Sequence, residues 1–153
     1  WLVIFAYFTM LPYKITAGGF HLKTNIGCTI GTLTIYYGNV LISKYIIWTS
    51  IYAKYTVIFM IFVFSIIMVS LYAPADTVNL PILTKRERKT KRILSYVFAT
   101  ITLLVAIIIK DNILSNILLL NVLIESICIS KVAYKLTKNE YGYENYLKEL
   151  KVR

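Results

Sequence analysis

The sequence has 153 residues, a formal net charge of +10 and a hydrophobic fraction of 58%, with a mean hydropathy of +0.68. Soluble domains are usually about 45–50% apolar with glycine included, and here the apolar residues gather in long runs separated by short polar segments. This pattern excludes an ordinary soluble domain and indicates an integral membrane protein. Because the basic residues crowd at the ends of the apolar runs, they are typical of membrane orientation signals, and we expect no nucleic-acid partner.

The first half of the chain contains three apolar segments. Residues 1–12 are shorter than the roughly 20 residues of a transmembrane helix, so they predict the second half of a helix whose beginning is missing, with Pro12 marking its end. A further span is predicted over residues 28–47, and the clearest span covers 56–71. The aromatic residues and lysines between these two spans are typical of a membrane interface. They are Lys44, Trp48, Tyr52, Lys54 and Tyr55.

The second half predicts a basic loop, two closely joined spans and a polar tail. The loop over residues 75–92 ends in a block of six basic residues. Spans over 93–109 and 113–133 are linked by only three residues, which requires an antiparallel helical hairpin. We therefore expect an all-α fold, a polytopic transmembrane helical bundle with about five visible spans, the first truncated, and about six in the complete protein. Residues 1–133 would form the membrane-embedded domain and 134–153 a cytoplasmic tail.

The basic block gives the bundle an orientation. The positive-inside rule places this block in the cytoplasm, which puts 44–54 and 110–112 outside and the segment 14–28 inside, together with the tail. Basic clusters of this kind also attract anionic lipid head groups, so membrane lipids are expected partners. The block consists of Lys85, Arg86, Arg88, Lys89, Lys91 and Arg92.

The segment between the first two spans contains the only histidine, His21, and one of the two cysteines, Cys28. A cysteine nucleophile needs a base or a cationic neighbour to become a thiolate, and histidine suits that task near neutral pH. Seven positions along a straight helix span about 10.5 Å, so the chain must bend between the two residues, and Asn25 and Gly27 allow a bend. Cys28 would then open the next helix, whose positive end favours a thiolate.

These residues also have plainer interpretations. A histidine beside two glycines at a helix end can be an interfacial residue, and a cysteine in a membrane helix can serve packing alone. Cys128, in the final span, is assigned to packing. With a single histidine and neither a paired-cysteine nor an HExxH spacing, we expect no metal and no other cofactor.

Two acidic residues are further candidates. Glu125 lies deep in the last predicted span, and a carboxylate inside a membrane is a functional candidate by default. It could be protonated, pair with a lysine or orient His21. Asp76, just after Pro74, could do the same from the membrane edge. The structural alternatives are a buried hydrogen bond for Glu125 and a helix-capping role for Asp76.

Two motifs resemble those of one known family. The stretch GGFHLKTNIGC at residues 18–28 resembles the histidine–cysteine motif of the AgrB (accessory gene regulator protein B) family, with the same seven-residue step. The stretch YAPADTVNLPI at residues 72–82 resembles that family's second signature, which precedes a basic loop. The order of spans, the short hairpin and an intramembrane glutamate also agree, so that the resemblance covers about residues 14–134.

The resemblance implies a membrane cysteine endopeptidase of quorum sensing in Gram-positive bacteria, acting as a homodimer with its active site at the cytoplasmic face of the cell membrane. Such an enzyme removes the carboxyl-terminal tail of an AgrD-like precursor peptide and closes a thiolactone or lactone ring through a thioester acyl-enzyme. Cys28 would be the nucleophile and His21 its base, with Lys14, Asp76 and Glu125 as possible supporting residues. The alternative is a non-catalytic polytopic membrane protein, such as a peptide transporter or export component.

The sequence departs from the family pattern at two places. Lys14 stands where the family often has arginine, which keeps the charge but loses the bidentate fork. Residues 78–80 stand where a lysine run can follow the second signature, and positive charge here begins only at Lys85. Whether residues 78–80 contact the peptide is therefore an open question, and so is whether a form without the amino-terminal part is active.

Overall fold

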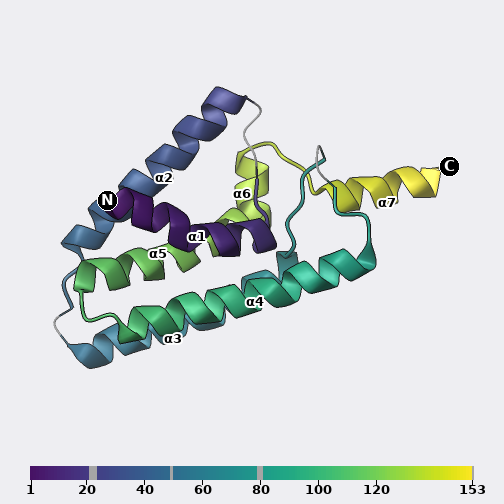
Figure 1. Ribbon diagram of the computed structural model, residues 1–153. Coiled ribbons are helices and arrows are strands. Elements are labelled where there is room, and N and C mark those ends of the chain that lie inside the picture. Colours follow the sequence, from purple (N-terminus) through teal and green to yellow (C-terminus); the bar gives the residue numbers. More distant parts are fainter. Residues whose placement is uncertain (21–23, 49, 79–80, 153) are drawn as a thin grey trace.

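The computed structural model of the chain describes residues 1–20, 24–48, 50–78 and 81–152. Every regular element within these residues is a helix (Figure 1). The helices are α1 (Leu2–Ala17), α2 (Asn25–Tyr45), α3 (Ile51–Tyr72), α4 (Lys85–Ile108), α5 (Asn112–Cys128), α6 (Lys131–Leu136) and α7 (Gly142–Val152).

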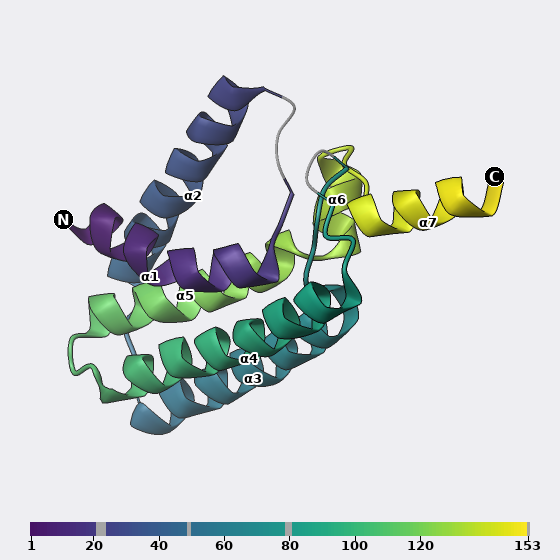
Figure 2. The same ribbon diagram turned by 45° about the vertical axis from the view of Figure 1, so that its right-hand side comes forward.

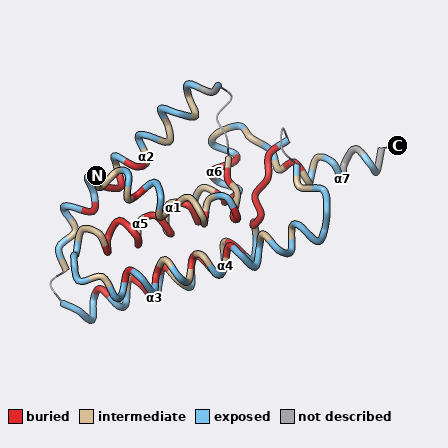
Figure 3. The backbone as a smooth tube through the Cα atoms, in the orientation of Figure 1, coloured by how far each residue is buried: buried red, intermediate tan, exposed pale blue. Residues whose placement is uncertain are grey.

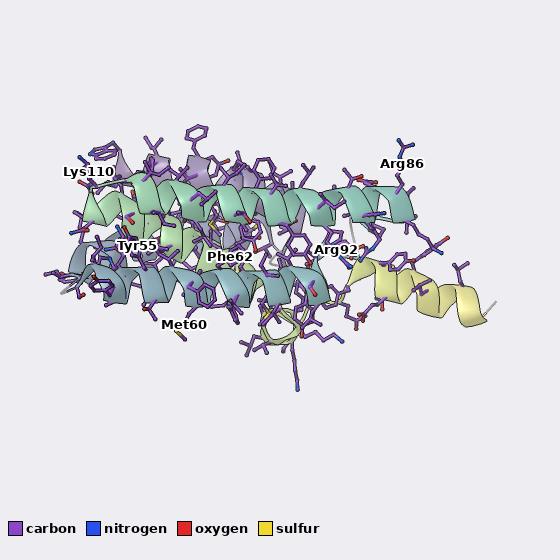
Figure 4. The ribbon with its side chains drawn as sticks, turned by 90° about the horizontal axis from the view of Figure 1, so that it is seen from below. Tyr55, Met60, Phe62, Arg86, Arg92 and Lys110 are labelled. Carbon is purple, nitrogen blue, oxygen red and sulfur yellow. The ribbon has the colours of Figure 1, made fainter. Side chains whose placement is uncertain are left out.

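Three of these helices are long and apolar enough to cross a membrane, namely α2, α3 and α4. The apolar helices α1 and α5 are shorter, with 16 and 17 residues, at the lower end of the roughly 17–25 residues of membrane spans. Large apolar side chains cover the outer surface, such as Met60, which is 64% exposed and points away from α3 (Figure 4). The predicted all-α membrane helical bundle is confirmed, and the chain is a multi-pass membrane protein.

Helix α5 is the centre of the bundle, since it contacts α1, α2, α3 and α4. Helices α3 and α4 lie side by side along one edge, and α1 packs against both α4 and α5 (Figures 1 and 2). Helix α2 leans away from the others toward its amino-terminal end, and its buried residues lie between Tyr36 and Ser43, in its second half. The first half of α2 is therefore the least packed part of the membrane region.

Polar side chains on α5 fasten it to its neighbours. Asn121 accepts from Asn39 Nδ2 at 2.7 Å and donates to Ala6 O at 2.9 Å. Asn116 accepts from Trp48 Nε1 at 2.6 Å. Because a buried polar group without a partner costs free energy, these reciprocal bonds fix the depth and rotation of α5 against α1 and α2.

Three predicted boundaries are wrong, each for a local reason. Helix α1 continues through Pro12 to Ala17, because Tyr13 packs in the core and bonds Ser65 and Ser126. The basic block forms the first turns of α4 and not a loop. The last span ends at Cys128, where Ser130 begins a new helix by accepting from Ala133 N at 3.3 Å.

The ends of α1, α3 and α5 and the beginnings of α2 and α4 lie at one end of the bundle, which we call the basic end (Figure 1). At this end, residues 73–77 form an extended buried segment (Figure 3). Helix α7 projects outward from the same end (Figures 1 and 2). All candidate site residues within the described part of the chain lie at the basic end.

Candidate functional site

The two sequence motifs meet where α1 ends. Gly18 and Ala75 form a parallel bridge, in which Ala75 N donates to Ala17 O at 2.7 Å and Gly19 N donates to Ala75 O at 2.9 Å. The bridge joins the glycine pair that precedes the histidine–cysteine segment to the second signature. The position of one motif therefore depends on the other.

Only glycine fits the first position of this bridge. Gly18 has a φ of 83°, a left-handed conformation that side chains disfavour. A Cβ atom at Gly18 would also overlap the carbonyl oxygen of Ala75. The glycine thus permits the close backbone approach that ties α1 to the 73–77 segment.

Asp76 holds the 73–77 segment to the start of α4. Its Oδ2 accepts from Ile82 N at 2.9 Å and pairs with Arg88 Nη1 at 3.1 Å. Arg92 adds a bond from Nε to Ala73 O at 2.7 Å. The carboxylate side chain is 1% exposed, and its Oδ1 makes no hydrogen bond with a described residue. Asp76 does not cap a helix; it fixes a loop through an ion pair.

The carboxyl-terminal part of the chain covers the same segment. The Tyr134 hydroxyl donates to Ala75 O at 3.0 Å and to Asp76 O at 3.2 Å, and its ring stacks on Tyr141 with centroids 4.1 Å apart. Burial raises the pKa of the Tyr134 phenol above its usual range, because a buried phenolate lacks water. The hydroxyl therefore remains a donor, and Ala75 O accepts hydrogen bonds from both the Tyr134 hydroxyl and Gly19 N.

Cys28 lies in the first turn of α2. The helix begins at Asn25, after Thr24 caps it by accepting from Gly27 N at 3.1 Å. The chain from α1 to α2 is thus not one straight helix. A contact between His21 and Cys28 would require such a break. The change of direction comes before Asn25, since Gly27 is already helical. His21 itself falls at 21–23, outside the described residues.

A cavity of about 520 Å³ connects Cys28 with two of the predicted supporting residues. Lys14 from α1, Cys28 from α2 and Glu125 from α5 line its three walls. Apolar and aromatic side chains and three threonines complete the lining, and Cys128 also reaches it. A space of this size is within the usual range of about 300–1,000 Å³ for ligand sites.

Glu125 is the unusual member of this group. It is fully buried, and neither of its side-chain oxygens makes a hydrogen bond with a described residue. A Cβ atom at Gly19 would begin 3.4 Å from Glu125 Oε1, so the glycine lets the carboxylate come close to the backbone of the loop. Glu125 belongs to the last turn of α5, and this places it at the basic end instead of deep in the membrane as the sequence had suggested.

Asp76 faces a different cavity. This second space, of about 340 Å³, is lined by Asp76, Lys14 and Lys91 together with residues 18–20. Lys14, Gly19 and Phe20 border both cavities. The structure therefore brings Lys14, Cys28 and Glu125 together, and sets Asp76 on the other side of the glycine segment.

Two contributors to this site escaped prediction. The roles of Ala75 and Tyr134 depend on contacts between residues 56 or more positions apart (Gly19 bonds Ala75, and Tyr134 bonds Ala75 and Asp76). The signal that could have suggested them is the glycine pair itself, because adjacent glycines often mark close backbone contact. Among the described residues, no group of three or more His, Cys, Asp or Glu side chains could hold a metal ion.

The fold and this site define a class: a multi-pass helical membrane protein with a cysteine and a buried carboxylate sharing a cavity at its basic end. Comparison with known families then assigns the chain. The model of the family Accessory gene regulator B matches residues 1–129. The chain belongs to the AgrB family, which relates it to the accessory gene regulator system.

Relatives named as AgrB-like support this assignment. The protein of Listeria welshimeri is 26% identical over 129 residues, 84% of this chain and 61% of the relative. That of Clostridium acetobutylicum is 25% identical over 137 residues, 87% of this chain and 63% of the relative. The chain thus spans about three-fifths of the length of these relatives. No solved structure matches it.

Proposed function

We propose that the chain belongs to a membrane cysteine endopeptidase that removes the carboxyl-terminal tail of an AgrD-like precursor peptide and promotes its cyclisation. The observation that carries this proposal is the cavity shared by Cys28, Lys14 and Glu125. A nucleophile at a helix start, beside one cation and one buried carboxylate, is a suitable arrangement for acyl transfer. Membership of the AgrB family supports the same function.

In the proposed reaction, His21 removes the thiol proton of Cys28, and the thiolate attacks the scissile carbonyl carbon. A carbon–sulfur bond forms, the peptide C–N bond breaks, and the proton passes from His21 to the leaving amine. The product is a thioester acyl-enzyme. A cysteine or serine side chain of the same peptide then gives its proton to His21 and attacks the thioester carbonyl carbon. The carbon–sulfur bond to Cys28 breaks, the thiolactone or lactone ring closes, and His21 returns the proton to the Cys28 thiolate.

The surrounding charges have separate proposed roles. Lys14 would stabilise the negative charge that develops on the carbonyl oxygen, as cations do in acyl transfer. Glu125, whose oxygens have no hydrogen-bond partner among the described residues, would accept a hydrogen bond from an N–H of His21 or of the bound peptide. Asp76 would support the reaction only indirectly, because its Oδ2 is engaged with Arg88 and Ile82.

The basic residues near this site indicate which face of the membrane it lies at. The basic block and Cys28 lie at the same end of the bundle, and lysine and arginine clusters favour the cytoplasm. We therefore place the reaction at the cytoplasmic face, where a newly made peptide is available. The protein would act as a homodimer, as the family resemblance implies.

The test is co-expression of a full-length form with its precursor peptide, followed by mass spectrometry of the peptide. Cys28→Ala and His21→Ala should each abolish tail removal, while Cys128→Ala should preserve it. Cys128 is the matched control because it lines the same cavity. Tail removal by Cys28→Ala would refute the proposed mechanism. Intact precursor that is bound and exported by all forms would instead favour an export component.

A further inference from the structure

We propose that a second site at the basic end binds a phosphate group as a singly charged phosphodiester, the form offered by the head group of an anionic phospholipid. The site is a cavity of about 250 Å³ where α3, α4, α6 and α7 come together. It lies apart from the cavity of Cys28, with which it shares no lining residue. The proposal therefore goes beyond the proposed peptidase function and does not depend on it.

Three cations from two helices line this cavity. Arg88 and Arg92 come from α4, and Lys131 is the first residue of α6. Figure 4 shows Arg92 on the side of α4 that faces α3 and the start of α7, whereas Arg86 points away at the end of the helix. The lining is completed by Leu71, Tyr72, Tyr141, Tyr143 and Glu144.

The hydrogen bonds divide these cations into engaged and available groups. Arg88 is engaged, since it pairs with Asp76 and lies 4.2 Å from the centre of the Tyr143 ring. Arg92 uses Nε for Ala73 O. Its two Nη atoms and the Nζ atom of Lys131 make no hydrogen bond or ion pair with any described residue. These are the donors that a ligand could use.

The balance of charge selects the ligand. With Arg88 neutralised by Asp76, Arg92 and Lys131 face one carboxylate, that of Glu144. One positive charge is left without a counterion in the cavity. A phosphodiester carries one negative charge and offers oxygens to both an arginine fork and a lysine ammonium group. It therefore matches the site in charge and in hydrogen bonding.

The position of the cavity favours a lipid as the source of that phosphate. It lies where the apolar helix α3 ends at Tyr72 and the basic block of α4 begins, the depth at which head groups and aromatic belts are found. Leu71 is 62% exposed, and Phe59 and Ile67 are also exposed along α3. Acyl chains could follow this surface while the phosphate enters the cavity, as in basic pockets that bind lipid head groups.

Binding would also affect the loop that carries the second signature. Arg92 contacts Ala73 O, and Arg88 contacts Asp76. A phosphate that binds Arg92 would hold this side chain and its bond to Ala73 O in place, which would stiffen residues 73–76, and we expect it to raise the unfolding temperature of the protein. This effect provides a readout that is independent of peptide cleavage.

The experiment uses the full-length protein in nanodiscs or detergent, titrated with phosphatidylglycerol and, separately, phosphatidylcholine. Native mass spectrometry counts bound lipid, and thermal unfolding measures the stabilisation. Lys131→Gln should weaken phosphatidylglycerol binding about five- to tenfold, as expected for one lost basic contact, because Lys131 is exposed and holds no described residue in place. The matched control is Lys135→Gln on the same helix, which is also exposed and lies outside the cavity.

Two further arms make the result decisive. Arg92→Lys keeps the charge and should bind better than Arg92→Gln, which separates recognition from the structural bond to Ala73 O. Stabilisation by inorganic phosphate that Lys131→Gln abolishes would support the phosphate site and assign its ligand to solution instead of lipid. Equal loss of binding in Lys131→Gln and Lys135→Gln, or equal binding of both lipids, would overturn the proposal, since it would reflect general surface charge or apolar adsorption.

Discussion

Two buried carboxylates at the basic end of the bundle, Asp76 and Glu125, are used in opposite ways. Asp76 pairs with Arg88 at 3.1 Å and accepts from Ile82 N at 2.9 Å, so that one of its oxygens holds a loop in place. Glu125 is also buried, but neither of its oxygens has a hydrogen-bond partner among the described residues. A buried carboxylate to which no described residue donates contributes little to stability, which supports the proposed role of Glu125 in the reaction.

The contrast extends to the neighbours of Glu125 on α5. Asn116 and Asn121 bond other helices, and the Ser126 hydroxyl lies 3.1 Å from that of Tyr13. The polar side chains of α5 that pack against other parts of the bundle therefore have hydrogen-bond partners. At Glu125, beside the cavity of Cys28, no described residue donates to the carboxylate. The loop region around Asp76 has the properties of a scaffold, whereas the cavity region is the proposed reaction site.

Among the substitutions that test the scaffold, Gly18→Ala should have the largest effect on stability. The added methyl group would overlap the Ala75 carbonyl, and the residue would keep a φ of 83°. We expect a loss of more than about 3 kcal/mol in the free energy of unfolding, measured by thermal or denaturant unfolding in detergent. Gly38→Ala is the control, because nothing lies within 4 Å of the added Cβ, and it should be neutral or stabilise α2 by up to about 1 kcal/mol. Similar stability of both variants would contradict the bridge.

The next largest effect is expected for Asp76→Asn. The amide can still accept from Ile82 N but leaves Arg88 without its counterion. Removing one partner of a buried pair costs about 3–5 kcal/mol, and because the Arg88 side chain is 20% exposed we expect about 2 kcal/mol. Glu87→Gln is the control: its pair with Lys91 is exposed, and its loss should cost less than about 0.5 kcal/mol. Equal effects would mean that Asp76 is not a structural anchor.

The sequence predicted the features that depend on composition and local spacing. Apolar runs predicted the membrane helices, and the confirmed fold class follows from them. The seven-residue step between His21 and Cys28 predicts a change of direction if the two residues pair; α2 begins at Asn25, but His21 lies outside the described residues, so this stays a prediction. The fold class could be predicted because it depends on hydropathy and on helix geometry alone.

Features that depend on tertiary contacts could not be predicted in this way. The apolar run over 113–133 is continuous, yet it divides at Ser130, whose hydroxyl caps α6. Proline at position 12 suggested a helix end, but packing of Tyr13 in the core keeps the helix intact. The bridge between Gly18 and Ala75 joins distant parts of the chain. In each case a contact outside the local window outweighs the local preference.

A smaller effect on the scaffold is expected for Tyr134→Phe. The variant loses the bonds to Ala75 O and Asp76 O but retains the stacking on Tyr141. Ala75 O still accepts a hydrogen bond from Gly19 N, so this buried acceptor keeps a partner. We therefore expect a loss of about 1 kcal/mol in the free energy of unfolding. Thermal unfolding of Tyr134→Phe against Tyr146→Phe, a partly exposed tyrosine of α7, would measure it. A loss as large as that of Asp76→Asn would show that the hydroxyl is a principal anchor.

The smallest effect on stability, and the sharpest test of the comparison, is expected for Glu125→Gln. The substitution keeps the volume and removes the charge from a site where no described residue donates to the carboxylate. The free energy of unfolding should therefore stay within about 1 kcal/mol of the parent or rise. Peptide processing should fall by at least about 100-fold, the effect expected when a group that assists proton transfer is lost.

These two measurements on Glu125→Gln distinguish the possible roles of the carboxylate. Unchanged processing with a loss of more than about 2 kcal/mol would assign Glu125 to the scaffold, beside Asp76. If Glu125→Gln loses both stability and processing, Glu125→Asp decides between the roles. It keeps the charge on a shorter side chain and should recover part of the activity if charge is what the site requires. Retained stability with lost processing is the outcome that only a reaction-site role explains, because a packing residue cannot lose its function while the packing persists.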